Sequence, residues 1–344
     1  MKAGLLSYRL YTELPLIEKL SRPWDILLES TRCNRAFSSA CWFLSVCKSD
    51  SSLVPCVITA WRGRKLAGIL PLVDVPARDS TEFPPFFSDY NDIIADPDDL
   101  PVSEGLLEFS FSLGKPLLLG NLRLDSACYR AVAQARPEFA ERLFQIERRC
   151  LYISLNSSYD DYLASRSRSL RAELWRNERL ARHDGLRIRA LSPNDLAPEM
   201  LPEVFLSISL ERFKEKSAFQ EPGAQAFVRA AFPDLFRQGR LKPFVLMAGE
   251  RIIAINICMA GANGLCFWNG GFLREAAGYS PGKLLLAEQL RQSFALAMED
   301  HDMLRGEHSY KARWATGARS IGRFEFEPGF SLLSERCAAA GSYD

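Results

Sequence analysis

The chain has 344 residues, of which 43 are lysine or arginine and 42 are aspartate or glutamate, so its formal net charge is +1. This balance excludes a polycation that wraps on nucleic acid over its whole surface, although a local basic patch stays compatible with it. A hydrophobic fraction of 47% is that of a globular protein. No apolar run reaches the roughly 18 residues of a transmembrane helix, and the length predicts two domains of roughly 150 residues.

The N-terminal segment, MKAGLLSYRLYTELPLIEKL, has neither the long apolar run nor the small-residue cleavage site of a secretory signal. The nine cysteines are scattered, odd in number and never spaced as CxxC. Such cysteines are typical of buried thiols in a reducing compartment. The sequence therefore predicts a cytoplasmic protein with no disulfide framework, no zinc site and no metal cofactor.

Charge is distributed unevenly along the chain. Residues 79–114 hold nine acidic residues and no basic one, whereas residues 166–189 hold eight arginines against three acidic residues. A strand-like segment, Leu151–Leu155, runs between these blocks. We therefore expect an N-terminal domain of residues 1–150, a C-terminal domain of residues 151–330, and a loose tail at 331–344 whose residues show little periodicity.

Each half contains a predicted β-hairpin, and the two hairpins are similar in composition. In the first half the strand 54–60 is followed by a turn at 61–64 and a returning strand at 65–75. In the second half the strands lie at 243–248 and 251–260. Both pairs are rich in β-branched and apolar residues around a glycine-containing break, as hairpins require. Their likeness suggests an internal duplication.

The second half continues with a strand at 265–272, which completes a three-stranded antiparallel meander, and then a glycine-bearing loop. A long helix follows, with Ser280 as its predicted N-cap and Pro281 at its first position, where a missing N–H costs nothing. Its predicted apolar stripe is formed by Leu286, Leu290, Phe294 and Ala297. A short strand at 302–304 then leads into a loop that becomes helical by residue 314.

This order of elements places a helix N-terminus beside the C-terminal end of the strand before it. Unpaired backbone N–H groups and the helix dipole make such a place favourable for anions, and a diphosphate fits there. Neither GxGxxG nor GxxxxGK[ST] occurs in the chain. The sequence therefore predicts no dinucleotide or nucleoside triphosphate site.

The arginine-rich block at 166–189 is predicted to be a helix with Leu163, Leu170 and Leu174 on its buried side. Its arginines are compatible with tRNA, with an anionic lipid surface, with an anionic acceptor, or with a solvated face. Elsewhere, Asp89, Tyr90 and Asp92 lie in an aromatic-rich segment, FPPFFSDYND. Paired carboxylates bind an ammonium or a polyhydroxyl acceptor, and a solvated acidic loop is the alternative.

Four chemically active side chains lie at or just beyond the end of the strand at 302–304: Asp302, Arg305, Glu307 and His308. Transfer of an acyl group to an amine requires the unprotonated amine, so a base within hydrogen-bond reach assists it. Glu307 and His308 are residues of the right type. A surface histidine, and structural ion pairs of Asp302 or Glu307 with Arg305 or Lys311, are the alternatives.

Tyr310, Lys311 and Trp314 follow at positions i, i+1 and i+4. On a helix Tyr310 and Trp314 share a face while Lys311 points elsewhere. The two aromatic residues are compatible with a site or with a core pair. Lys311 is a candidate for binding a phosphate or an acidic acceptor.

Several short motifs occur in a characteristic order. They are Trp24-Asp25, Asn34-x-x-Phe37, Trp42, Ala67-Gly-Ile-Leu-Pro71, Asp89-Tyr90-x-Asp92, the run from Tyr162 to Arg171, Tyr279-Ser-Pro-Gly282, and the run from Asp302 to Trp314. Together they resemble the Gcn5-related acetyltransferase (GNAT) superfamily, in its branch of CelD-like and BioF2-like acetyltransferase domains. That branch is related to the FemAB-type peptidoglycan ligases.

The resemblance implies an α+β fold in α/β/α layers, with two GNAT-like domains in tandem. Each would have a mixed, largely antiparallel sheet flanked by helices. The N-terminal domain would be degenerate and hold the acceptor cleft, and the C-terminal domain would bind the acyl donor. The loop 274–283 would hold the coenzyme A diphosphate. The implied donor-binding residues are Arg274, Tyr279, Ser280, Gly282, Lys283, Trp268 and Asn269.

The implied catalytic residues are Glu307, His308, Tyr310 and Asp302, with Tyr310 protonating the departing thiolate. The implied acceptor-binding residues are Asp89, Tyr90, Asp92, Arg305, Lys311 and Trp314. The loop reads Gly278-Tyr-Ser-Pro-Gly282-Lys rather than the superfamily's usual Arg/Gln-x-x-Gly-x-Gly/Ala. This departure leaves acyl-CoA, another acyl thioester and aminoacyl-tRNA open as donors.

The resemblance therefore predicts a cytoplasmic N-acyltransferase that moves an acyl group from acyl-CoA to an amine. An amino sugar or a long-chain amine of cell-envelope lipid or polysaccharide synthesis would be the acceptor. The backbone of residues 265–269 would bind the donor and its carbonyl oxygen. The alternatives are a FemAB-like aminoacyl-tRNA-dependent ligase, a non-catalytic accessory protein of polysaccharide production, and an adaptor on the inner face of an anionic membrane.

Overall fold

The computed structural model describes residues 5–85 and 87–333. The chain divides into two compact units, which differ from the predicted domains at one end. Unit 1 comprises the residues up to Arg148 together with those from Ser320 onward, and unit 2 comprises Arg149–Arg319. Residues 320–330, assigned above to the C-terminal domain, thus belong to unit 1. Most of the predicted tail, residues 334–344, lies outside the described residues.

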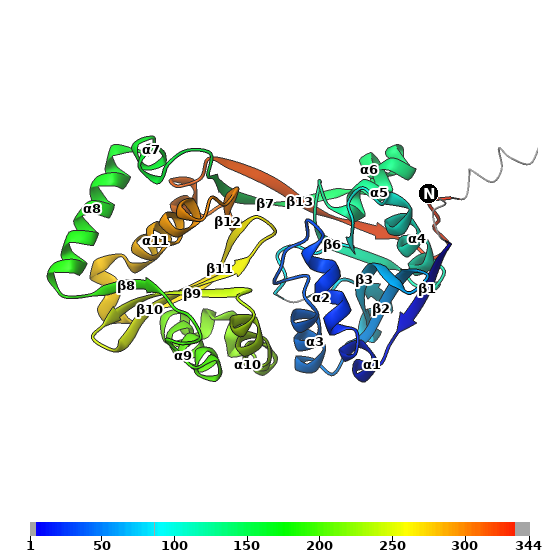
Figure 1. The fold of residues 1–344 in the computed structure, drawn as a ribbon, viewed down its shortest axis with the longest axis horizontal. Coiled ribbons are helices and arrows are strands. Elements are labelled where there is room, and N and C mark those ends of the chain that lie inside the picture. The colour runs from blue at the N-terminus through cyan, green and yellow to red at the C-terminus, as the bar shows by residue number, and fades with distance from the viewer. Residues whose placement is uncertain (1–4, 86, 334–344) are drawn as a thin grey trace, which may run out of the picture. The chain divides into compact units, whose positions relative to one another are not determined.

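Unit 1 is a mixed sheet flanked by helices (Figure 1). Its strands are β1 (Leu6–Tyr11), β2 (Val54–Arg62), β3 (Lys65–Val75), β4 (Ser80–Glu82), β5 (Ile94–Ala95), β6 (Leu117–Arg123) and the end of β13 (Gly317–Phe326). Its helices are α1 (Leu14–Glu18), α2 (Ser21–Glu29), α3 (Ala40–Ser49), α4 (Leu100–Phe111), α5 (Ala127–Ala135) and α6 (Pro137–Leu143). The strand order is β1-β2-β3-β4-β6-β13, with β5 added on β3.

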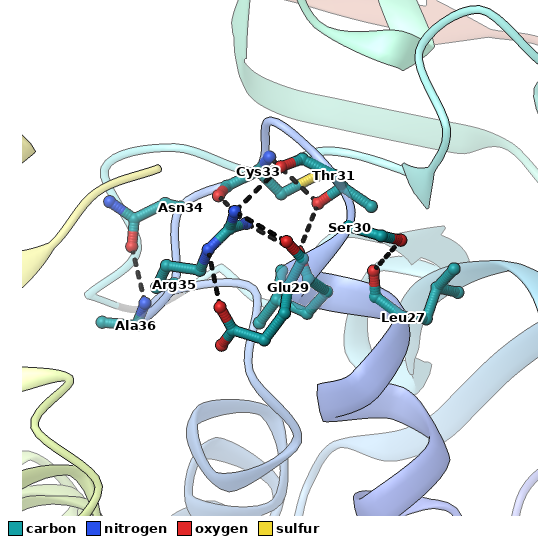
Figure 2. Close-up of polar contacts among 9 residues, drawn as sticks. Leu27, Glu29, Ser30, Thr31, Cys33, Asn34, Arg35 and Ala36 are labelled. Carbon is teal, nitrogen blue, oxygen red and sulfur yellow. Dashed lines mark hydrogen bonds and ion pairs between the residues drawn. The ribbon is translucent and has the colours of Figure 1, made fainter. Parts of the chain in front are cut away.

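A half-buried arginine, Arg35, fixes the loop that follows α2. The Arg35 guanidinium donates hydrogen bonds to the carbonyl oxygens of Leu28 (2.6 Å), Thr31 (2.9 Å) and Cys33 (3.1 Å), as Figure 2 shows. Its Nε atom lies 3.2 Å from the Glu29 carboxylate. The last carbonyl groups of a helix lack internal partners, and a cation there is favoured by the helix dipole. Arg35 therefore terminates α2 and shapes the segment that contains the Asn34 motif.

Unit 2 is also a mixed sheet between helices. Its strands are β7 (Gln145–Ser154), β8 (Arg187–Ala190), β9 (Leu241–Ala248), β10 (Arg251–Ala260), β11 (Gly264–Phe272) and β12 (Asp300–Arg305). Its helices are α7 (Tyr159–Ala164), α8 (Arg168–His183), α9 (Leu201–Phe213), α10 (Pro222–Arg237), α11 (Pro281–Ala295) and α12 (Ser309–Ala312). The strand order is β7-β12-β11-β10-β9-β8.

The helices of unit 2 cover both faces of its sheet. Helix α9 packs closely on one face, where a Cβ atom at Gly271 would lie 3.2 Å from Ile208. Helix α11 contacts β9, β10 and β11 on the other face, and α8 lies beside α11 (Figure 1). This is the predicted α/β/α layering. Within residues 5–85 and 87–333, no helix has the length and apolar character needed to cross a bilayer.

The two sheets repeat the same pattern of strand directions. In unit 1, β1, β2, β3 and β4 are successively antiparallel, β4 and β6 are parallel, and β6 and β13 are antiparallel. In unit 2, β8, β9, β10 and β11 are successively antiparallel, β11 and β12 are parallel, and β12 and β7 are antiparallel. The predicted α+β class and the tandem duplication are confirmed.

The sixth strand of each sheet comes from the other half of the sequence. Strand β7 follows the helices of unit 1 but its residues 150–154 pair with β12. Strand β13 follows the helix α12 of unit 2, yet its residues 321–326 pair with β6. The phenylalanines Phe324 and Phe326 then join the hydrophobic core of unit 1. This exchange of strands is the reason why the observed boundaries differ from the predicted ones.

The predicted local elements of the second half are confirmed with small differences. The long helix α11 begins at Pro281, after Ser280, as expected. It ends at Ala295, so Ala297, placed above in its apolar stripe, lies beyond the helix with a φ of 49°. The arginine-rich segment 166–189, predicted to be one helix, forms α8 only over Arg168–His183, which buries Leu170 and Leu174. Leu163, placed above on the same buried side, belongs to α7, and residues 187–190 form β8.

Candidate functional site

Two parallel strands of unit 2 separate from one another after a short paired stretch. Strands β11 and β12 are paired only at Gly264–Asp300, Leu265–His301 and Cys266–Asp302, although β11 continues to Phe272. A Cβ atom at Gly264 would lie 2.2 Å from the Asp300 carbonyl oxygen. Glycine at this position thus allows the close approach at the paired end. Beyond it, backbone groups of β11 that face β12 pair with no strand within residues 5–85 and 87–333, which leaves them available to a ligand.

An irregularity in β11 coincides with the separation. Asn269 is paired with Ile257 and Phe267 with Cys258 of β10, so Trp268 is an extra residue in β11. Such a bulge bends its strand and increases the local twist. Trp268 packs in an aromatic cluster with Phe205, Phe219 and Phe232 of the α9–α10 layer. The Asn269 carboxamide oxygen accepts a hydrogen bond from the Gly270 N–H at 2.8 Å.

The N-terminus of α11 has no side-chain cap. Ser280 adopts a left-handed conformation, with φ 51° and ψ 56°, and its hydroxyl does not accept a hydrogen bond from the helix. By contrast, the N-cap serines Ser39, Ser126, Ser158 and Ser167 each accept a backbone N–H of their helices. Gly282 is exposed, and nothing lies within 4 Å of where its Cβ atom would be. The first turn of α11 therefore offers open space and a positive dipole end.

The polar side chains next to this helix start are engaged with their neighbours. The Tyr279 hydroxyl donates to the Asp184 carboxylate at 2.7 Å. Lys283, predicted to be a donor-binding cation, forms an ion pair with Glu173 of α8. The Arg274 backbone N–H donates to Glu211. The structure thus brings the predicted loop residues together at one end of unit 2, with the Lys283 ammonium directed toward Glu173.

Glu173 joins three parts of unit 2. Besides Lys283 it accepts two hydrogen bonds from Arg313, at 3.1 and 3.0 Å. The Arg313 guanidinium and the Lys283 ammonium lower the pKa of the Glu173 carboxyl to about 2. No local pattern in the sequence marks Glu173 as a functional residue, because its partners lie 110 and 140 residues away in the chain.

The stability that Glu173 contributes depends on pH. Because its pKa is lower in the folded protein than in the unfolded chain, this contribution is fully present above about pH 5. It is lost progressively as the pH falls from there toward 2. We expect the difference in unfolding free energy between the native protein and Glu173→Gln to shrink between pH 7 and pH 3.5, measured by urea denaturation. The control is Glu250→Gln, which removes an exposed surface ion pair and should change the unfolding free energy little at any pH. If the effect of Glu173→Gln on the unfolding free energy did not depend on pH, the low pKa of Glu173 would be contradicted.

The end of β12 is held by buried charges. The Asp302 side chain is 1% exposed. It accepts a hydrogen bond from the Leu304 N–H at 2.7 Å and lies 3.1 Å from the Arg319 guanidinium. Asp302, predicted above as a catalytic residue, is therefore directed into the protein, where it supports the strand end.

Lys311 is likewise an internal group. Its ammonium donates to the carbonyl oxygens of Met303 (2.6 Å) and Arg305 (2.7 Å), and its side chain is buried. Between these residues Leu304 has a φ of 55°, which is strained for a branched side chain. Lys311 thus holds a kinked strand end instead of presenting its charge to a phosphate or an acidic acceptor.

The prediction that Tyr310 and Trp314 share a helix face is wrong. Helix α12 ends at Ala312, before Trp314. The Trp314 side chain is buried, and its carbonyl oxygen accepts the Tyr162 hydroxyl at 2.6 Å. Trp314 is a core residue of unit 2, whereas Tyr310 remains 43% exposed.

Three exposed side chains with acid–base chemistry follow β12. Glu307 lies 3.3 Å from Arg149 at the surface, and the His308 ring stacks on the Tyr310 ring at a centroid distance of 6.0 Å. Partial burial raises the pKa of the Tyr310 phenol, so this group stays protonated at neutral pH and is able to donate a proton. Of the four predicted catalytic residues, these three are accessible to a substrate.

The predicted acceptor residues of unit 1 are largely engaged in its structure. The Asp92 carboxylate accepts the N–H groups of Ala127 and Cys128, both at 2.9 Å. It thereby occupies the N-terminus of α5. Burial raises the pKa of Asp92 to about 6, against the backbone donors that lower it. Asp89 is buried, and the Arg123 guanidinium lies over the Tyr90 ring.

Comparison with known proteins finds a family match within unit 2. Residues 168–312 match the family described as "Acetyltransferase (GNAT) domain". This segment contains the meander, the uncapped helix α11 and the separated strands β11 and β12. The matched segment lies within unit 2 and covers less than half of the chain, so it supports a GNAT-like fold for this unit. Among curated protein sequences, none matches this chain.

Solved structures extend the likeness to both units. FemX superposes with a TM-score of 0.63 and 11% identity over 93% of this chain and 98% of FemX. L-PGS from Bacillus licheniformis gives 0.58 and 11% over 92% and 95%. The C-terminal domain of a putative lysylphosphatidylglycerol synthetase from Agrobacterium fabrum gives 0.56 and 10% over 94% and 97%. The predicted membership in the GNAT-like, FemAB-related fold is confirmed.

Proposed function

We propose that this protein is an N-acyltransferase that moves an acyl group from acyl-CoA to an amine, with the donor bound by unit 2. The observation that supports this most directly is the coincidence of two features at one end of unit 2. The uncapped N-terminus of α11 suits a diphosphate. The separation of β11 from β12 leaves backbone groups for the amide-bearing pantetheine chain.

A comparison of the two units explains why the donor would bind unit 2. In the repeated topology, α4 of unit 1 corresponds to α11. Three carboxylates, Asp96, Asp98 and Asp99, immediately precede α4, and Asp99 makes a two-pronged ion pair with Arg62 at 2.6 and 2.8 Å. This negative charge opposes a diphosphate at that helix. The first turn of α11 contains no acidic residue.

The proposed chemistry needs few groups. The amine nitrogen attacks the thioester carbonyl carbon, and the C–N bond forms as the C–S bond breaks. Glu307 or His308 accepts the proton that the nitrogen loses, directly or through water. The Tyr310 phenol, which is exposed beside His308, gives its proton to the CoA thiolate. Backbone N–H groups of β11 stabilise the developing oxyanion.

The acceptor is proposed to be an amine of cell-envelope synthesis, either an amino sugar or a long-chain amine. A second candidate function is supported by the similarity of the whole chain to FemX and L-PGS. In that case the donor would be an aminoacyl-tRNA and the product an aminoacylated amine. The two functions differ in whether free CoA binds.

Calorimetric titration with CoA, acetyl-CoA, octanoyl-CoA and palmitoyl-CoA tests the donor assignment. We expect the native protein to bind, and the variant Gly282→Asp to bind at least about 10-fold more weakly because its carboxylate repels the diphosphate. The matched control is Gly282→Ala, for which there is open space and which keeps the backbone N–H. Its affinity should be close to that of the native protein.

Unchanged urea midpoints would establish that both variants fold. The proposal is contradicted if no CoA compound binds the native protein, or if Gly282→Asp binds as well as Gly282→Ala. Binding of aminoacyl-tRNA without any CoA binding would favour the second function. The CoA compound that binds most tightly would indicate the length of the acyl chain that the protein transfers.

A further inference from the structure

One face of α8 carries arginines on either side of an exposed tryptophan. We call this set the α8 stripe; it consists of Arg168, Arg171, Trp175, Arg179 and Arg182. Their spacing of three, four, four and three residues places them on one face of the helix. The opposite face buries Leu170, Leu174 and Ala181 against unit 2. The α8 stripe is therefore the exposed face of a helix whose apolar face is buried in the core of unit 2.

The charges of α8 are segregated between these faces. Its two glutamates are turned toward neighbouring elements, where Glu173 pairs with Lys283 and Arg313, and Glu178 pairs with Arg291 of α11. In the described part of the chain, no carboxylate pairs with any arginine of the α8 stripe. Among the described residues the stripe thus presents four positive charges that form no ion pair, which makes it complementary to an anionic surface.

Trp175 is unusual among the tryptophans of this protein. Its side chain is 62% exposed, whereas the other five are buried or half-buried. It sits at the centre of the stripe, with the Arg179 guanidinium 5.1 Å from the centroid of its ring. An indole combines a large apolar body with one N–H donor and therefore favours the boundary between water and hydrocarbon. Its exposure between cations indicates a partner that is both anionic and apolar.

The shape of the stripe favours a lipid surface over a nucleic acid. A straight helix segment of 14 residue steps is about 21 Å long and convex, which fits a plane better than it encloses a strand. Proteins that bind single strands combine a groove with open aromatic faces for base stacking. Here one face of the Trp175 ring is covered by Arg179. Amphipathic helices with basic residues and an aromatic anchor lie in the headgroup region of membranes.

We propose that α8 docks unit 2 on the surface of an anionic membrane. Trp175 would enter the headgroup region, and the four arginines would contact lipid phosphates. This proposal concerns the outer face of α8 and does not depend on the donor site at α11. It adds a place of action to the proposed function, because an enzyme bound in this way meets acceptors that are themselves lipids.

Vesicle co-sedimentation of the full chain tests the proposal. We expect binding to vesicles of phosphatidylglycerol and phosphatidylcholine mixed one to two, little binding to phosphatidylcholine alone, and weakening as salt is raised. The double variant Arg171→Glu with Arg179→Glu should bind the anionic vesicles at least about 10-fold more weakly. The matched control, Arg22→Glu with Arg64→Glu, makes the same change of charge at exposed positions of unit 1 and should bind like the native protein.

Tryptophan fluorescence gives a second readout, which reports whether the Trp175 indole enters the membrane and not only whether charges attract the protein to it. Quenching by brominated phosphatidylglycerol should affect the native protein and be lost in Trp175→Phe, because the other indoles are buried or half-buried. All these positions are exposed, so urea midpoints and CoA affinities should stay unchanged. The proposal is overturned if the stripe variant and its control bind vesicles equally. It is also overturned if the native protein binds tRNA through the stripe and no vesicle.

Discussion

Replacement of Arg319 by methionine is expected to lower the free energy of unfolding by about 3–5 kcal/mol. The Arg319 guanidinium lies between Asp300 and the buried carboxylate of Asp302, 3.1 Å from the latter. Removing one member of a buried ion pair leaves the other charge poorly compensated in a medium of low polarity. Urea denaturation at neutral pH measures the loss.

The same strand provides a matched control for this change. Arg323 of β13 pairs with Glu147 and Glu325 at the surface, and exposed pairs contribute about 0–1 kcal/mol. Arg323→Met should therefore have a small effect. Adding Asp302→Asn to Arg319→Met should restore part of the lost stability, since a neutral amide needs no guanidinium. Equal effects of the two arginine variants would show that burial of Asp302 has no energetic consequence.

Lys311→Met is expected to cost about 3 kcal/mol of stability. The variant has a similar length and fills the same space, but the carbonyl groups of Met303 and Arg305 lose the ammonium that donates to both. A buried acceptor that loses its donor costs about 1–3 kcal/mol. The left-handed Leu304 between them would also lose its support, so the end of β12 should relax.

The measurement combines urea denaturation with calorimetric titration of acetyl-CoA. If the strand separation binds the donor, Lys311→Met should weaken donor affinity in the folded protein as well as lower the midpoint. Lys65→Met, at an exposed lysine of β3, should change stability by less than about 0.5 kcal/mol. If the urea midpoint of Lys311→Met equalled that of the native protein, the structural role assigned to Lys311 would be contradicted.

The parts of the fold that could be predicted are those that depend on neighbouring residues. The start of α11 follows from Ser280 and Pro281, and the hairpin β9–β10 follows from two apolar runs around a glycine turn. The inner face of α8 follows from the spacing of its leucines. Each of these signals lies within a few residues of the element it specifies.

The exchange of β7 and β13 could not be predicted in this way. Both strands have an ordinary strand pattern, and nothing local specifies which sheet each one joins. Pairing is decided by contacts between segments about 150 to 200 residues apart in the chain, as for β12 with β7 and for β13 with β6. Register and strand choice are set by packing of the whole sheet.

For the candidate site residues, exposure follows from loop position and could be anticipated from the sequence, whereas the direction of the side chains could not. Glu307, His308 and Tyr310 are exposed after β12, as a loop requires. The inward direction of Lys311 depends on the left-handed backbone of Leu304. No local sequence pattern predicts this conformation for a leucine. Asp92 is predicted to bind an acceptor, but its carboxylate accepts backbone N–H groups at the N-terminus of α5, which begins 35 residues later in the chain. Alternation and helical spacing do not report such distant backbone partners.

The strand exchange has a consequence for biosynthesis. During translation, the first half leaves the ribosome with Leu117–Arg123 exposed along one edge, because the part of β13 that covers this edge is synthesised only after the whole of unit 2. Phe324 and Phe326 fill the core beside it. The sheet of unit 1 is therefore completed only after β13 has been synthesised, and a chain that stops before β13 would leave an open strand edge that is prone to aggregation.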